Sequence, residues 1–116
     1  MRIGELSSRT GASQRSLRYY EQQGLLHAGR TASGYRDYAE DAVLRVDNVR
    51  RLLADGLTVD DVRTFLPCLD RDLAQEPACP PAVEVYQRRL ATVRRRRADL
   101  DQVHTRLTRQ LRHWGG

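Results

Sequence analysis

The stretch IGELSSRTGASQRSLRYYEQQGLL, residues 3–26, decides the fold because it predicts two short helices joined by a tight turn. Residues 3–10 have the spacing of a short helix, and Gly11 suits the left-handed conformation that ends many helices. Ser13 is a strong N-cap for a second helix that runs to about Gln22. Two short helices around such a turn form a helix-turn-helix pattern.

The segment after these helices has no helical period. In residues 28–38 a turn at Ser33-Gly34 lies between flanks that are rich in Thr, Tyr and Arg. Turn residues between β-prone flanks predict a small β-hairpin. A hairpin directly after a helix-turn-helix would form the wing of a winged domain.

Two further helices are expected before residue 67. The third opens at Glu40 or Asp41, and Thr58 with Asp61 resembles a capping box for the fourth, which Pro67 stops. The apolar face of the third helix is predicted from its period as Ala42, Val46, Val49 and Leu53, with Val43 and Leu52 beside it.

Residues 67–81 hold all four prolines and both cysteines of the chain, which predicts a constrained linker. A new period follows it. Alternating steps of three and four residues connect the a and d positions of an unbroken heptad stripe: Val83, Tyr86, Leu90, Val93, Arg97, Leu100, His104, Leu107, Leu111 and Trp114.

A helix that carries the 32-residue stripe from Val83 to Trp114 would be about 48 Å long, so the small N-terminal part cannot cover it. The simplest partner is a second copy of the chain, although packing within one chain is the alternative. Arg97 and His104 fall on the seam, where polar residues often set register and oligomeric state. The expected organisation is therefore a winged helix-turn-helix domain over residues 1–66, a Pro/Cys linker over 67–81 and a dimerisation helix over 82–114.

Charge is distributed unevenly along the 116 residues, which carry a net charge of +5 and contain arginine but no lysine. Residues 1–38 and 77–116 are basic, whereas residues 39–76 are acidic. A basic N-terminal block suits a polyanion such as DNA, and an ordinary solvated surface is the other interpretation.

Several function classes are excluded by composition and motif. Three histidines stand in no metal or nucleophile motif, and we find no glycine-rich phosphate loop or paired-carboxylate site. We therefore predict that the protein is not an enzyme and requires no cofactor. No apolar run approaches the roughly 18 residues of a spanning helix, and no secretory signal opens the chain, so we expect a cytoplasmic protein.

DNA binding fits the helix-turn-helix better. Residues near the start of the second helix reach base edges in the major groove, and here these are Ser13, Gln14, Arg15 and Arg18. Arg recognises guanine and Gln recognises adenine through paired hydrogen bonds. Phosphate contacts are expected from Tyr19, Tyr35 and Tyr38 and from Arg30 and Arg36 of the hairpin. For Tyr38, packing against the third helix is an equal alternative.

Over residues 1–67 the sequence resembles the MerR family of bacterial transcription regulators. The motifs that carry the resemblance occur in order and at the right spacing: Ile3-Gly4-Glu5-Leu6, Thr10-Gly11, Leu17-Arg18-Tyr19-Tyr20-Glu21, Gly24-Leu25-Leu26, Arg30-Thr31, Gly34-Tyr35-Arg36-Asp37-Tyr38 and Gly56-Leu57-Thr58. The long helix is similar to the antiparallel dimerisation helix of that family.

The resemblance implies a mostly α-helical fold, a winged helix-turn-helix followed by a long antiparallel coiled-coil helix. It further implies a homodimer on a palindromic operator, which activates RNA polymerase by bending and untwisting the promoter. The DNA contacts that it implies are Arg15, Arg18, Tyr19, Arg30, Tyr35 and Arg36.

The effector is less defined. Metal-sensing members have a cysteine at the start of the dimer helix and further ligands after that helix; Cys79 resembles the first, and no cysteine follows it here. Three interpretations of Cys68 and Cys79 stay open: buried structural residues, a reversible disulfide, or a metal site that His113 of the partner subunit completes.

Two alternative functions remain at this point. An excisionase-like architectural factor also uses a winged helix-turn-helix but generally lacks a long coil. A coiled-coil module could instead use its N-terminal domain to dock onto proteins.

Overall fold

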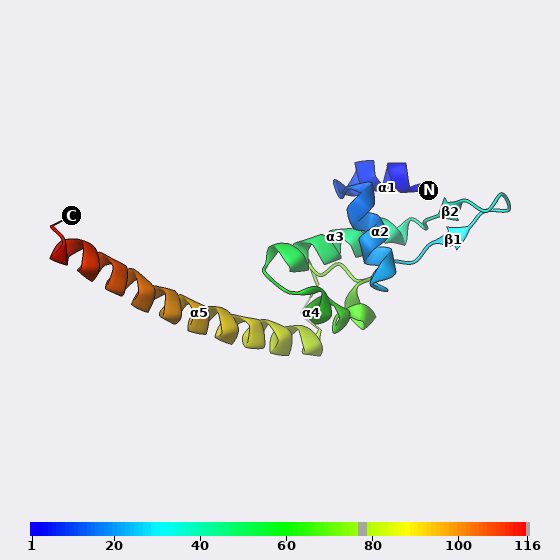
Figure 1. Ribbon diagram of the computed structural model, residues 1–116. Coiled ribbons are helices and arrows are strands. Elements are labelled where there is room, and N and C mark those ends of the chain that lie inside the picture. Colours follow the sequence, from blue (N-terminus) through cyan, green and yellow to red (C-terminus); the bar gives the residue numbers. More distant parts are fainter. Residues whose placement is uncertain (77–78, 116) are drawn as a thin grey trace.

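The first two helices form the predicted helix-turn-helix in a computed structural model that describes residues 1–76 and 79–115 (Figure 1). Helix α1 (Ile3–Thr10) ends at Gly11, which has a φ of 77°. Helix α2 (Gln14–Gln22) begins at Ser13, whose hydroxyl accepts a 3.0 Å hydrogen bond from the backbone N–H of Ser16. The cap fixes where α2 starts, and so which side chains its first turn presents.

The predicted hairpin is present as two short antiparallel strands, β1 (Gly29–Arg30) and β2 (Arg36–Asp37). Gly34 in the connecting turn has a φ of 83°, which favours glycine. The base of the hairpin is fixed to the start of the chain, because the Met1 ammonium donates to the Tyr38 carbonyl at 2.6 Å and to Asp37 at 3.0 Å.

Helix α3 (Asp41–Ala54) lies at the centre of the body, with Ala42, Val46 and Val49 in the core as expected. The predicted face is wrong at one position. Leu52, which was expected beside the apolar face, is buried, whereas Leu53, which was expected on it, is only partly buried. Asn48, one turn before Leu52, is also buried, and its amide donates to the backbone carbonyls of the following linker. The linker therefore covers this flank of α3.

Helix α4 (Val59–Arg63) begins with the predicted capping box but is shorter than expected. Pro67 does not end α4; it lies in the 3₁₀ turn η1 (Leu66–Cys68) that follows. The hydrophobic core continues beyond residue 66 into the predicted linker and the first turns of the long helix, through Cys68, Leu69, Cys79, Ala82 and Val85.

Helix α5 (Pro80–His113) leaves the body as a single rod, and the wing projects from the opposite side (Figure 1). The molecule is accordingly elongated, with extents of 72 × 32 × 22 Å. None of the helices described here has the length and apolarity needed to cross a membrane.

Among the described residues, the contacts between α5 and the body come from the first turns of this helix. Arg89 binds the Asp61 carboxylate at 2.7 and 3.1 Å, and the Tyr86 hydroxyl donates to Asp55 at 2.6 Å. Tyr86 also meets Phe65 edge to face, with 6.3 Å between the ring centroids. Burial, and then the hydrogen bond to Asp55, raise the pKa of the Tyr86 hydroxyl, which therefore stays a donor.

Asp61 joins α4 to α5, and its charge should stabilise the fold. Burial raises its pKa, but hydrogen bonds from Thr58 and Arg89 outweigh burial and hold the pKa below its usual value. A lowered folded-state pKa means that the stabilisation is present above about pH 4 and is lost as pH falls through the folded value.

We expect Asp61→Asn to lower the free energy of unfolding by roughly 1 kcal/mol at pH 7, because it loses the ion pair with Arg89 and weakens the cap. The difference from wild type should shrink below pH 4. Denaturant unfolding at fixed protein concentration measures it, with Asp60→Asn as the exposed neighbouring control. A loss that is independent of pH, or equal in the control, would contradict this role.

Candidate nucleic-acid interface

One face of the body gathers the exposed side chains of α2 and the wing. Leu17 and Tyr20 of α2 point into the core, and burial raises the pKa of the Tyr20 hydroxyl. The helical period therefore turns the remaining predicted contacts of α2 outward, and all four are exposed: Gln14, Arg15, Arg18 and Tyr19. Ser13 is also exposed, although its hydroxyl serves as the cap.

The wing adds three predicted residues to this face, Arg30, Tyr35 and Arg36, all exposed. The Arg30 guanidinium donates to the Gly34 carbonyl at 3.1 Å across the hairpin. Arg36 forms a 2.8 Å ion pair with Glu21 at the end of α2. The first contact braces the hairpin and the second holds the wing beside α2, while further N–H groups of both guanidinium groups stay available to a ligand.

Between α2, the wing and the chain start lies a hollow of about 300 Å³. Four arginines line it, Arg2, Arg18, Arg30 and Arg36, together with Tyr35. Such a concentration of guanidinium groups suits phosphate oxygens, which they bind through paired hydrogen bonds. The arrangement can hold a polyanion, and it offers no nucleophile or general base for catalysis.

Arg2 is a residue of this hollow that the sequence did not reveal. Its guanidinium carbon lies 4.2 Å from the centroid of the Tyr35 ring, in a cation–π contact. Residue 2 precedes the first helix and belongs to no motif. Its place in the hollow becomes apparent in the folded chain, where the wing lies against the start of the chain.

Tyr38 does not lie on this face, which corrects the expected phosphate contact. Its side chain is 1% exposed, and its hydroxyl donates to Glu21 at 3.1 Å. Burial, reinforced by the hydrogen bond to Glu21, raises the pKa of the Tyr38 hydroxyl. Glu21 thus connects Tyr38 in the core to Arg36 at the surface, so Tyr38 positions the wing from below.

The two cysteines lie on the other side of the body, at the root of α5. The structure joins Cys68 of η1 to Cys79, the N-cap residue of α5, by a disulfide. Both are buried, at 5% and 3% exposure. Within residues 1–76 and 79–115, no group of three His, Cys, Asp or Glu side chains could hold a metal ion.

Comparisons with known proteins agree with this arrangement. Residues 1–68 match the family described as MerR HTH family regulatory protein, and residues 43–110 match that described as MerR, DNA binding. The mercuric resistance operon regulatory protein of Bacillus cereus is 31% identical over 107 residues, which cover 91% of this chain and 79% of the relative. The HTH-type transcriptional regulator HmrR of Rhizobium leguminosarum bv. viciae is 32% identical over 113 residues, covering 97% and 82%.

Solved structures give the same result. The transcription regulator PbrR691 from Ralstonia metallidurans CH34, in complex with lead(II), superposes with a TM-score of 0.78 at 30% identity and covers 93% of this chain and 82% of that one. HiNmlR, a MerR family regulator lacking the sensor domain and bound to promoter DNA, has a TM-score of 0.60 at 19% identity, covering 90% and 78%. The latter likeness concerns the fold alone.

Arg18 lies both on α2 and in the arginine-lined hollow, so its loss should weaken DNA binding without unfolding the chain. We expect Arg18→Ala to reduce affinity for an operator selected with wild-type protein by about 1–3 kcal/mol. Fluorescence anisotropy measures the affinity, and circular dichroism checks the helix content. Arg109→Ala removes the same charge from an exposed position near the C-terminal end of α5 and should have little effect. Equal affinities for Arg18→Ala and wild type would show that α2 does not read the DNA.

Proposed function

The chain belongs to the MerR family of helix-turn-helix regulatory proteins and is a DNA-binding transcription regulator, not an enzyme; we propose that it acts as a homodimer that binds and distorts a palindromic promoter operator. The observation that carries the proposal is the pairing of a basic helix-turn-helix face with an uncovered apolar stripe on α5.

We assign the DNA contacts to two groups. Gln14, Arg15 and Arg18 stand on the first turns of α2, which is the part of a recognition helix that reaches base edges. Phosphate contacts fall to the residues around the arginine-lined hollow and the wing, namely Arg2, Tyr19, Arg30, Tyr35 and Arg36. The first group would select the sequence, and the second would fix the orientation of the protein on the duplex.

The dimer is supported by the solvent exposure of α5. Of the large hydrophobic side chains that the described residues leave exposed, all but Tyr19 and Tyr35 lie on this helix or its C-cap. Leu100 is 68% exposed in the single chain. A mainly apolar stripe of this length, interrupted by Arg97 and His104, marks an interface, and an identical helix has the complementary stripe.

A two-fold dimer presents two copies of α2 to the DNA, so its preferred site is palindromic. Its two wings and two arginine-lined hollows would hold phosphates on both sides of the centre. Bending and untwisting a promoter between those contacts costs on the order of a few kcal/mol, which the additional phosphate contacts can offset. RNA polymerase is the partner that would read the changed promoter geometry.

A metal effector is named for two of the relatives, mercuric ion resistance in one and lead(II) in the other. In this chain the two candidate sulfurs bond to each other, and no third donor joins them among the described residues. A metal site would therefore need a further ligand, such as His113 of the partner subunit, and we derive no metal-dependent step from the two sulfurs.

The cysteine pair instead supports a thiol-responsive input. The disulfide ties η1 to the first residue before α5, so its reduction would remove the covalent tie between the body and the root of the dimer helix. In the step that we propose, a small-molecule disulfide takes two electrons from the two thiols, one protein disulfide forms, and two small thiols leave with the two protons.

Native mass spectrometry of anaerobically reduced protein, before and after a small-molecule disulfide is added, tests this input. We expect the loss of two hydrogens per chain with the dimer intact, and no loss in Cys68→Ser. Unchanged mass after oxidation would contradict the input, and extra mass that a chelator removes would favour a metal instead.

Disrupting the seam should abolish the dimer and operator binding together. We expect the double variant Leu100→Asp with Leu107→Asp to sediment as a monomer and to lose operator binding, because charge replaces two seam leucines. Gln102→Asp with Thr105→Asp adds the same charges to the outer face of α5 and should remain a dimer. Monomers that bind the operator at wild-type affinity would favour an architectural DNA-binding factor.

A further inference from the structure

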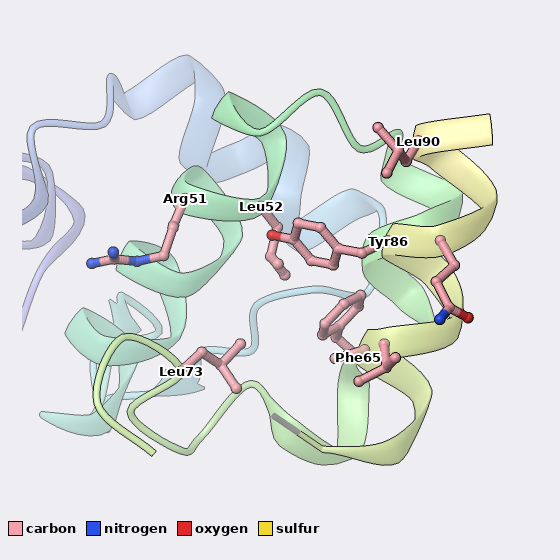
Figure 2. Close-up of a pocket in the computed structure, with 9 residues that line it drawn as sticks. Arg51, Leu52, Phe65, Leu73, Tyr86 and Leu90 are labelled. Atoms are coloured by element: carbon pink, nitrogen blue, oxygen red, sulfur yellow. The ribbon is translucent and has the colours of Figure 1, made fainter. Parts of the chain in front are cut away.

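An apolar hollow of about 530 Å³ opens at the root of α5 and has no role in the functions described above. Its body side is formed by Leu52 of α3, Phe65 and Leu73, and its α5 side by Val83, Tyr86 and Leu90. Figure 2 shows the Phe65 and Tyr86 rings close together, with Leu52 and Leu73 on the body side. The hollow is open to solvent in the single chain.

The hollow is continuous with the α5 seam. Val83, Tyr86 and Leu90 are the first three positions of the heptad stripe as well as one wall of the hollow. A helix that covers the stripe must therefore pass over the hollow at this end. What enters the hollow depends on the register of that helix.

The sequence of α5 selects one antiparallel register. Its ten seam positions lie symmetrically about the midpoint between Ala98 and Asp99. Reversing the helix about that point places an a position opposite a d position in every layer, as antiparallel packing requires. The layers are Arg97 with Leu100, Val93 with His104, Leu90 with Leu107, Tyr86 with Leu111, and Val83 with Trp114.

Registers one heptad away cover the seam less well. A shift in one direction leaves Leu111 and Trp114 unpaired, and a shift in the other leaves Val83 and Tyr86 unpaired. Only the central register covers all ten positions, so it buries the most apolar surface.

Charge favours the same register. Arg94 and Asp101 both occupy e positions, which flank the seam and face each other across an antiparallel pair. In the central register Arg94 comes beside Asp101 of the partner subunit, and the two-fold axis repeats the pair. Opposite charges meet at both places.

We infer that Trp114 of each chain fills the hollow at the root of the partner's α5. This inference rests on the proposed homodimer and specifies how its two ends are closed. Trp114 is 73% exposed in the single chain, more than any other large hydrophobic side chain in the described residues. Docking would place its ring among Phe65, Tyr86 and Leu73, where aromatic edges and faces can pack.

The contact has a mechanical consequence. Leu52 lies in α3, the helix against which α1 packs, and Phe65 follows α4. The end of one dimer helix would therefore press directly on the DNA-binding body of the other subunit. Each body would be held to both helices, so a change in the helix angle moves both copies of α2.

Trp114 is the only tryptophan of the chain, so intrinsic fluorescence reports its position directly. We expect the wild-type dimer to emit at shorter wavelength, and to be less quenched by acrylamide, than the monomeric Leu100→Asp/Leu107→Asp variant.

Leu73 lines the hollow but is not on the seam. Leu73→Asp should therefore shift the emission toward the monomer value while sedimentation still gives a dimer. Leu44→Asp changes a partly exposed leucine of α3 outside the hollow and serves as the matched control.

Dimer dissociation constants give a second measurement that does not depend on a polar substitution. Trp114→Ala should weaken the dimer by about tenfold or more, as for a buried aromatic anchor. Leu73→Ala should weaken the wild-type dimer but have little further effect in Trp114→Ala, because the two changes remove one contact.

Three results would overturn the inference. A wild-type dimer whose Trp114 is as accessible to acrylamide as in the monomer excludes docking and leaves the proposed homodimer intact. Strictly additive effects of Trp114→Ala and Leu73→Ala place the ring elsewhere on the partner. A wild-type protein that sediments as a monomer removes both the inference and the proposed homodimer.

Discussion

The uncovered apolar stripe of α5 is the constraint on which the rest of the structure depends. A helix of 34 residues that contacts the body only through its first turns has no intramolecular means of burying its leucines. Its exposed seam makes the single chain an incomplete unit, because apolar surface of this extent is removed from water in stable proteins. In the homodimer that we propose, association through α5 would therefore determine how far apart two DNA-binding bodies stand and how they are oriented.

In the proposed dimer, a few contacts within the body would transmit that geometry to the DNA-binding face. At the root of α5, Arg89 binds Asp61, and Tyr86 binds Asp55 at the end of α3. At the other end of the body, Glu21 of α2 accepts hydrogen bonds from Arg36 and Tyr38, which fixes the wing against the recognition helix. Helix α3 connects the two regions. A body connected in this way would suit the DNA distortion that we propose.

Much of this fold could be predicted because its signals are local. The cap at Ser13, the capping box at Thr58 and Asp61, and the glycine turns each depend on residues within one helical turn. The heptad stripe of α5 is long enough to be unambiguous. These features, with the MerR motifs, were enough to identify the family and to predict which side chains of α2 are exposed.

Features that depend on distant contacts could not be predicted in this way. A strand of two residues is too short to show the alternation of apolar and polar side chains that marks a buried face. The sequence therefore could not show that Tyr38 is buried and donates its hydroxyl to Glu21. Asn48 is buried because the linker carbonyls return to α3, and Arg2 reaches the interface only because the wing folds back. The bond between Cys68 and Cys79 likewise depends on how the linker closes.

The most direct test of the account is the mass of the protein–DNA complex. Operators selected from random duplexes by the wild-type protein should be palindromic, and analytical ultracentrifugation should find two chains on each duplex. Destroying one half-site should then abolish stable binding by the dimer, since both copies of α2 contribute. A single chain per duplex, on a site without two-fold symmetry, would contradict the claim that α5 determines how this protein recognises DNA.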